Sequence, residues 1–342
     1  MEHKPTILLI YTGGTIGMIR DFETGALQNF DFTQLLEHIP ELQLLDCSIE
    51  TLSFEAPIDS SDMNPSHWVT LAKMISANYD RFDGFVVLHG SDTMSYTASA
   101  MSFMLENLQK PVIFTGSQLP VGDLRTDAKE NLITSIQIAA ACDGDLPMVR
   151  EVGLYFEYKL YRGNRTTKIN AEHFEAFASL NYPALAESGV HLNFDTAKLW
   201  RSKTDAPLIV RTQMEQRIAL IKLFPGITQG IFTVLLQSSG LKGLILETYG
   251  AGNATTEAWF LDAIKSFVDS GVPVINVTQC SGGSVSMGDY ATSVGLKKLG
   301  VISGADMTTE AALCKLMYLL GQQLTPAQFK EAYERSLRGE RS

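Results

Sequence analysis

Short apolar runs alternate with longer amphipathic segments along most of the chain. We interpret as strands the runs at 6–11, 48–54, 84–89, 111–115 and 152–156, and further on those at 217–223, 243–249 and 272–278. Segments with helical spacing lie between them, at 64–79, 91–108, 125–142, 228–239, 255–270 and 308–321. Asn64 predicts a cap for the first of these helices, and Pro65 its first turn. Buried strands that alternate with helices indicate βαβ units and a mainly parallel sheet.

The alternation lapses between about residues 157 and 215, where Asn, Arg, Pro and Ser are frequent. We therefore expect two α/β domains with a boundary near 195–215. The larger N-terminal domain, with the mainly parallel sheet, is predicted over 1–195. A linker is expected over 196–214, and a smaller C-terminal α/β domain over 215–342.

Composition narrows the range of partners and compartments. The 342 residues are 45% hydrophobic and 19% charged, which is typical of a globular protein with a sizeable core. A net charge of −11 argues against nucleic-acid or anionic-membrane partners, which need a basic surface. The apolar stretch near the N-terminus is too short for a signal peptide, and no run approaches the ~18 apolar residues of a membrane span. We therefore expect a cytoplasmic protein that contacts no membrane.

Cysteine and histidine give no support for a metal site. The cysteines are scattered singly, at 47, 142, 280 and 314, and suggest neither a zinc site nor a disulfide framework. No H-x-x-x-H pair occurs among the six histidines. No metal and no cofactor is expected.

Polar loops follow each of four predicted strands in the first half. They are TGGT after ILLIY, DSSDM at 59–63, HGSDT at 89–93 and TGSQ at 115–118. The carboxyl ends of parallel strands share one edge of a sheet, where ligands bind. We expect the four loops to converge on one site lined with Thr, Ser and Asp. The stretches ETYGAGN at 247–253 and TQCSGGS at 278–284 take the same strand-to-loop positions in the second half.

The first loop, TGGTIG at 12–17, fits neither a dinucleotide fingerprint nor a P-loop. A glycine-rich turn without chemistry is one interpretation. The other is a nucleophile, Thr15, beside backbone N–H groups that stabilise an oxyanion.

A threonine hydroxyl needs a partner that takes its proton, and no His, Asp or Glu lies beside Thr15 in the sequence. HGSDT supplies Ser91 and Asp92, although Asp92 could simply cap the following helix. YRGNRTTK at 161–168 offers Lys168 as a buried proton relay, or else is a solvated basic loop with Arg162 and Arg165. His89 is expected to be a packed or capping residue.

Seven stretches, taken together and in order, resemble the bacterial-type L-asparaginases, specifically the cytoplasmic type I branch. The stretches are YTGGTIGM, DSSDM, GFVVLHGSDTMSYTASA, KPVIFTGSQLP, YRGNRTTK, YGAGNA and TQCSGGSVSMGDYAT. They extend across nearly the whole chain.

The resemblance implies hydrolysis of L-asparagine to L-aspartate and ammonia through a covalent acyl-enzyme. Thr15 matches the nucleophile, while Ser91, Asp92 and Lys168 match a cluster that acts in proton transfer, acyl-enzyme hydrolysis and substrate holding. The α-carboxylate of the substrate is expected at Asp59, Ser60 and Ser61, and its α-ammonium at Asp92. The implied assembly is a homotetramer built from intimate dimers, in which Asn253 reaches into the neighbouring subunit's site.

Three positions depart from the family pattern. Ser91 stands where threonine is usual, so the methyl group that restricts the rotamer is missing. Ala26 stands where many relatives carry a tyrosine that polarises the nucleophile. Glu247 replaces an arginine that some type I enzymes use, together with the position of Cys280, to bind an activating asparagine. An acid there would repel the ligand's carboxylate, so we expect weakened or absent activation by asparagine.

Two alternative functions fit the same fold. One is the ammonia-releasing subunit of a tRNA-dependent amidotransferase, for which an additional N-terminal domain would be expected before TGGT. The other is a catalytically silent amino-acid-binding protein, which would have no need of a nucleophile.

Overall fold

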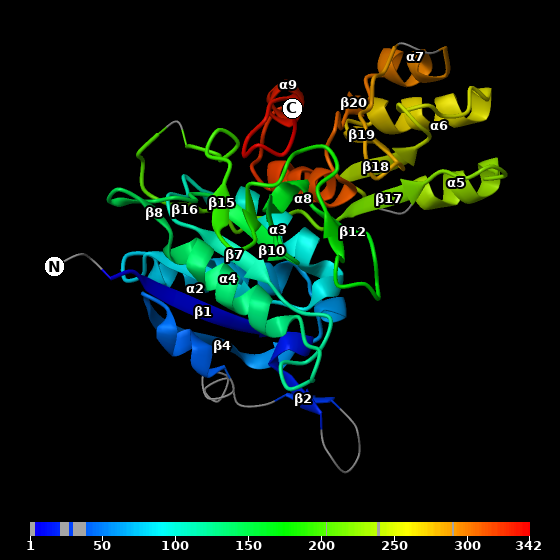
Figure 1. The fold of residues 1–342 in the computed structure, drawn as a ribbon. Helices are drawn as coiled ribbons and strands as arrows, with labels where there is room; N and C mark the ends of the chain where they lie inside the picture. The colour runs from blue at the N-terminus through cyan, green and yellow to red at the C-terminus, as the bar shows by residue number, and fades with distance from the viewer. Residues whose placement is uncertain (1–3, 21–26, 30–38, 203, 238–239, 289–290) are drawn as a thin grey trace. The chain divides into compact units, whose positions relative to one another are not determined.

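The computed structural model describes residues 4–20, 27–29, 39–202, 204–237, 240–288 and 291–342. The chain divides into a first unit, Met1–Thr212, and a second, Gln213–Ser342 (Figure 1). This division falls inside the 196–214 stretch, whose role as a linker stays a prediction. Among the described residues, no helix combines the length and apolar character that a membrane span requires.

The first unit is built on an eight-stranded sheet in the order β15-β14-β11-β10-β7-β5-β1-β4. The parallel strands are β1 (Thr6–Gly13), β4 (Ser48–Ile58), β5 (Gly84–Leu88), β7 (Val112–Thr115) and β10 (Val152–Phe156). The antiparallel strands at one side are β11 (Lys159–Arg162), β14 (Ala186–Ser188) and β15 (Leu192–Phe194). The predicted mainly parallel α/β sheet is confirmed, with its parallel strands where the apolar runs placed them.

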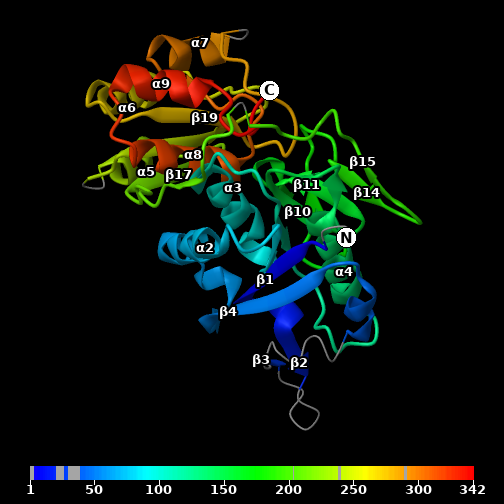
Figure 2. The same ribbon diagram turned by 90° about the vertical axis from the view of Figure 1, so that its left-hand side faces the viewer.

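Within the described part of this unit, three helices cover the sheet. Helix α4 (Ala128–Ala140) packs Leu132 and Ile136 against the face that carries Leu9 and Val86. Helices α2 (Pro65–Asn78) and α3 (Met94–Met104) lie on the opposite side from α4 (Figure 2). The predicted cap of α2 is confirmed, because Asn64 Oδ1 accepts a hydrogen bond from the Ser66 N–H at 3.0 Å.

As the sequence predicts, the alternation of strands and helices lapses between about residues 157 and 215. Within the described part of this stretch, strands β11 to β16 follow one another with no α-helix between them. A tight turn at Glu157 and Tyr158, with φ of 44° and 68°, joins β10 to β11 as an antiparallel hairpin. Such turns are usually marked by Asn-Gly or Asp-Gly. The pair Glu157–Tyr158 lacks these turn residues, so the sequence did not indicate the hairpin. The alternation of strands and helices ends at this point, where the sheet becomes antiparallel.

The first unit also contains short strands that form two-stranded sheets. They are β2 (Met18–Arg20) with β3 (Leu27–Asn29), β8 (Cys142–Asp143) with β9 (Leu146–Pro147), β12 (Thr167–Lys168) with β13 (Phe177–Ala178), and β6 (Leu105–Glu106) with β16 (Ile209–Val210).

The second unit has a parallel four-stranded sheet in the order β17-β18-β19-β20. Its strands are β17 (Ile218–Lys222), β18 (Gly243–Thr248), β19 (Val274–Thr278) and β20 (Ile302–Ser303). Its helices are α5 (Gln229–Leu236), α6 (Ala258–Asp269), α7 (Ala291–Lys298), α8 (Thr309–Leu320) and α9 (Pro326–Glu334). The core includes Phe232 of α5, Phe260 of α6 and Leu246 of β18. Strand β20 and helices α7 and α9 were not among the predicted elements.

Strand order places a topological switch point at β1. The chain first adds β4 on one side of β1 and then β5 on the other. In open parallel sheets, ligands bind outside the carboxyl ends of the strands where the order reverses in this way. The loop that carries Thr15 follows β1 directly.

Candidate active site

Three of the predicted loops meet at two glycines. Gly14, with φ of 91°, lies so close to the next loop that an added Cβ would be 2.5 Å from Gly90 Cα. A Cβ on Gly90 would in turn be 2.5 Å from Ser60 Oγ. Glycine therefore allows the loops after β1, β5 and β4 to approach closely, and the predicted convergence of these loops is confirmed.

Thr15 begins a single 3-10 turn, η1 (Thr15–Gly17), just after this contact. Ile16 and Gly17 are buried, whereas Thr15 is half-buried and retains exposed surface. The turn is held by hydrogen bonds from the Gly17 N–H and the Tyr11 hydroxyl to the Gly14 carbonyl, at 3.2 and 3.3 Å. Because Thr15 follows Gly14 and Ser91 follows Gly90, both hydroxyl residues lie at the same edge of the sheet.

Lys168 joins Ser91 and Asp92 in one cluster. Its Nζ donates to Ser91 Oγ at 2.8 Å and to Asp92 Oδ1 at 2.6 Å. The Lys168 side chain is 17% exposed and that of Asp92 is 65% exposed. Asp92 forms no capping bond at the start of α3, whose N-cap is Thr93. The helix-cap interpretation of Asp92 is therefore not supported, and its carboxylate instead holds the lysine.

Burial of two arginines fixes the segment that carries Lys168. Arg162 Nε pairs with Glu151 Oε2 at 2.6 Å, and both side chains are at most 5% exposed. Arg165 is buried with its guanidinium 5.2 Å from the centre of the Tyr182 ring. The interpretation of YRGNRTTK as a solvated basic loop is wrong, because two of its cations belong to the core.

The residues predicted to bind the α-carboxylate form a tight turn after β4. Ser60 is buried against Gly90, and its carbonyl accepts from Thr93 Oγ1 at 2.7 Å. Asp59 Oδ1 accepts from both the N–H and the hydroxyl of Ser61, each at 2.8 Å. These bonds lower the pKa of Asp59. Both Ser61 donors face Asp59, so a bound carboxylate would have to displace this pairing.

Asn253 belongs to the second unit. It forms an isolated bridge with Tyr249, and its Oδ1 accepts from Thr292 Oγ1 at 2.8 Å. Its predicted role in a neighbouring copy's site stays a prediction.

Of the two other positions that depart from the family pattern, the structure describes Glu247, whereas Ala26 lies outside the described residues. Glu247 is in β18, where its carboxylate accepts from Thr309 Oγ1 at 2.7 Å and lies 3.5 Å from Lys222 Nζ. Cys280 is exposed two residues beyond β19.

Gln118 belongs to the polar loop TGSQ at 115–118 and has no role assigned from the sequence. Its side chain faces Ser91, with 3.3 Å between Ser91 Oγ and Gln118 Oε1. The only sequence signal for this residue is its place directly after the buried strand β7. The strand order that sets β7 beside β5 is what brings Gln118 to Ser91.

His89 is fully buried just before this cluster and does not face it. Its Nδ1 lies 2.7 Å from the Gly90 carbonyl, and Nε2 has no hydrogen-bond partner among the described residues. Burial lowers the pKa of His89 to about 4. The imidazole is therefore neutral at pH 7, as suits a packed residue.

This burial predicts an acid-sensitive fold. Between pH 6.5 and 4 the unfolded chain binds more protons at His89 than the folded chain does, so stability falls as pH falls. The histidine is expected to remove about 2 kcal/mol of unfolding free energy between pH 7 and pH 5. Urea unfolding at both pH values tests this. His89→Asn keeps an N–H donor near the Gly90 carbonyl and should lose less stability on acidification. An equal acid-induced loss in the variant would exclude His89 as the cause.

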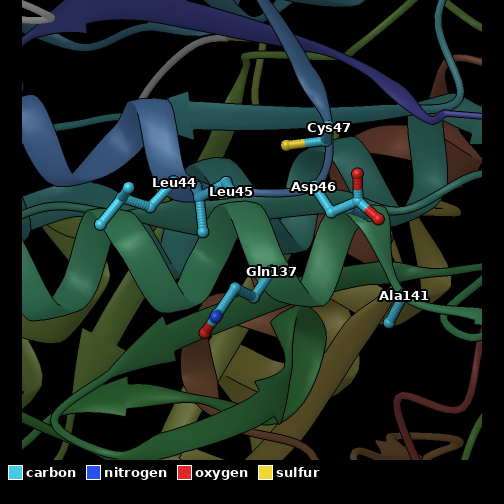
Figure 3. Close-up of a pocket in the computed structure, with 7 residues that line it drawn as sticks. Leu44, Leu45, Asp46, Cys47, Gln137 and Ala141 are labelled. Carbon is cyan, nitrogen blue, oxygen red and sulfur yellow. The ribbon is translucent and has the colours of Figure 1, made fainter.

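A cavity of about 210 Å³ lies elsewhere, between the start of β4 and the end of α4. Figure 3 shows its lining, which includes Asp46, Cys47 and Gln137 and none of the predicted site residues. It is beside the amino end of β4, whereas the Lys168 cluster is at the carboxyl ends of the strands. Among the described residues, no group of three or more His, Cys, Asp or Glu side chains is arranged to hold a metal ion.

Comparison with known proteins identifies relatives over both units. The family described as "Asparaginase, N-terminal" matches residues 6–199, and "Glutaminase/Asparaginase C-terminal domain" matches residues 217–333. L-asparaginase 1 of Escherichia coli strain K12 is 45% identical over 98% of both chains.

Solved structures agree with this. The crystal structure of L-asparaginase I from Vibrio cholerae is 41% identical, with a TM-score of 0.90 over 99% of this chain and 100% of that chain. The thermostable L-asparaginase from Thermococcus kodakarensis is 29% identical, with a TM-score of 0.89 over 98% and 99% of the two chains.

Proposed function

The chain belongs to the asparaginase family, and from this premise we propose that it hydrolyses L-asparagine to L-aspartate and ammonia. The observation that carries the proposal is the cluster of Lys168 with Ser91 and Asp92, held beside the glycine contact that precedes Thr15. This arrangement combines a hydroxyl nucleophile with charged groups at one sheet edge, as acyl transfer requires.

Thr15 is the nucleophile of the proposed reaction. Its Oγ1 forms a bond to the side-chain carbonyl carbon of asparagine as its proton passes to the cluster of Ser91, Asp92 and Lys168, and the resulting oxyanion is stabilised by backbone N–H groups of the loop. Collapse of the adduct breaks the C–N bond, and the amide nitrogen takes that proton from the cluster and leaves as ammonia. Water then attacks the aspartyl ester and releases L-aspartate, which restores the Thr15 hydroxyl.

Lys168, Ser91 and Asp92 serve proton transfer and ester hydrolysis. The contacts of Lys168 support this role, because an ammonium between a hydroxyl and a carboxylate fixes both and stabilises negative charge that develops nearby. Asp92 is 65% exposed and has room to meet the α-ammonium of the substrate. Asp59, Ser60 and Ser61 receive the α-carboxylate, through a rearrangement of the Asp59–Ser61 pair.

We further propose a cytoplasmic homotetramer made of intimate dimers, in which Asn253 completes the neighbouring copy's site. The family membership supports this assembly. The net charge of −11 fits a chain that contacts neither nucleic acid nor an anionic membrane. Activation by asparagine is expected to be weak or absent. A ligand carboxylate at Glu247 would meet a carboxylate that is already paired with Lys222 and Thr309.

Ammonia release from L-asparagine, measured over a wide concentration range, tests the proposed function. Light scattering on the same preparation is expected to give the mass of four chains. We expect turnover of L-asparagine with a hyperbolic dependence on concentration, and L-glutamine serves as the comparison substrate. Heat of binding for asparagine without any turnover would contradict the enzyme and favour an amino-acid-binding protein. A sigmoidal curve that disappears when Cys280 is changed would contradict the expectation for Glu247.

A further inference from the structure

We propose that Gln118 is a positioning residue that fixes the Ser91 hydroxyl for the acyl transfer proposed above. This inference rests on that proposed function. Gln118 lies in the loop after β7, while Ser91 follows β5, the adjacent strand. The distance from Ser91 Oγ to Gln118 Oε1 is 3.3 Å. At this length the hydrogen bond is a long one, so its effect depends on how firmly the amide is held.

The orientation of the Gln118 amide follows from its other contacts. Its Nε2 lies 3.2 Å from the Ala171 carbonyl and 2.9 Å from the His173 carbonyl. Carbonyl oxygens only accept, so the NH₂ group must face them and Oε1 must face Ser91. The reverse orientation would place an amide oxygen against two carbonyl oxygens.

The direction of each hydrogen bond at Ser91 is then determined. The Lys168 ammonium has only donors, so Ser91 Oγ accepts from Nζ at 2.8 Å. Gln118 Oε1 has only acceptor sites, so the Ser91 hydrogen points to Gln118. One lone pair of Ser91 Oγ remains available, directed by these two contacts, to accept from the attacking water or from Thr15.

The backbone of Gln118 is held by a buried carboxylate. Asp127 Oδ2 accepts from the Gln118 N–H at 2.9 Å, and Oδ1 accepts from the Leu119 N–H at 3.1 Å. Asp127 is 6% exposed, immediately before α4. The buried Asn131 of α4 donates to the Gly116 carbonyl in the same loop at 3.0 Å. Gln118 therefore projects from an anchored loop, and it links Ser91 to the chain that follows Lys168.

This link explains how serine can replace threonine at position 91. The methyl group of threonine restricts χ1, whereas serine can occupy all three staggered rotamers. At Ser91 the missing restraint comes from two opposed partners, Lys168 as donor and Gln118 as acceptor. If so, the need for Gln118 should disappear when threonine is restored.

A cycle of four proteins tests this: the unmodified chain, Gln118→Met, Ser91→Thr and the double variant. Methionine keeps the length of the side chain but neither accepts from Ser91 nor donates to the 171 and 173 carbonyls. We expect Gln118→Met to lower kcat about tenfold with KM changed less than about twofold. In the Ser91→Thr background the same change should lower kcat less than about threefold. Threonine keeps the hydroxyl at position 91, and kcat of Ser91→Thr itself is the reference value for the double variant.

Asn170→Ala is the matched control for general loosening of the loop. Asn170 Oδ1 accepts from the N–H groups of Glu172 and His173, at 2.8 and 2.9 Å, and has no contact with Ser91. Its effect on kcat should be the same with serine or threonine at 91. Three outcomes would overturn the inference for Gln118. They are equal losses of kcat for Gln118→Met in both backgrounds, no loss in either background, and a rescue of Asn170→Ala by threonine at 91. Absence of turnover in the unmodified protein would instead overturn the proposed function, and with it this inference.

Discussion

Thr15→Ala is expected to lower ammonia release from L-asparagine at least about a thousandfold, because no acyl-enzyme can form without the hydroxyl. The fold should persist. Thr15 is half-buried, and the bonds that hold its turn go to the Gly14 carbonyl rather than to its side chain. The measurement is kcat for both proteins, together with circular dichroism to show equal folding.

Thr12→Val is the matched control for this change. Thr12 lies near the end of β1, three residues before Thr15, but its hydroxyl is buried and donates to the Leu88 carbonyl at 3.0 Å. Valine has the same shape and removes that hydroxyl, so the variant should lose stability while kcat stays within about tenfold of the unmodified value. Greater loss of turnover in Thr12→Val than in Thr15→Ala would contradict the assignment of Thr15.

Lys315→Met is expected to cost about 3–5 kcal/mol of stability in the second unit. Lys315 and Glu340 are both fully buried, and Nζ also donates to the Tyr333 and Arg335 carbonyls. Glu340 accepts from the N–H groups of Leu337 and Arg338, so the pair ties the C-terminal segment to α8. Removal of the lysine leaves a buried carboxylate without its countercharge. Hydrogen exchange of the α8 amides measures the loss.

Two further variants test whether the loss of stability comes from the buried ion pair. Lys315→Met combined with Glu340→Gln removes both charges and should recover part of the loss, because no unpaired charge is left buried. Lys265→Met removes an exposed lysine that pairs with Asp269 four residues along α6, and should change the exchange of α8 little. Equal effects of Lys315→Met and Lys265→Met would contradict a stabilising role for the buried pair.

The sequence was most informative where hydrophobic pattern decides structure. All the parallel strands except the two-residue β20 were predictable, because buried strands are continuous apolar runs such as GFVVL. The hairpin of β10 and β11 was not predictable, since its turn uses Glu157 and Tyr158 in place of glycine or asparagine. The Asn131 side chain, from a distant helix, accepts from the Glu157 N–H at 3.1 Å and helps to hold that turn.

Site prediction was limited in the same way. Thr15, Ser91 and Asp92 follow strands directly, so the sequence could place them at one sheet edge. The position of Lys168 could not be predicted without the fold. Its segment is fixed by the buried ion pair of Arg162, at the end of β11, with Glu151, directly before β10. Gln118 needed the fold too, since its contacts with Ser91 and with the 171–173 loop join three separate parts of the chain.

Identification of the acylated residue tests the central claim most directly. The enzyme would be mixed with L-asparagine, quenched in acid during turnover and digested, and its peptides analysed by mass spectrometry. We predict an aspartyl group on the peptide that contains Thr15, localised to that residue by fragmentation and absent from Thr15→Ala. An aspartyl group on Ser91 or Thr12, or undiminished turnover by Thr15→Ala, would contradict the assignment of Thr15 as the nucleophile.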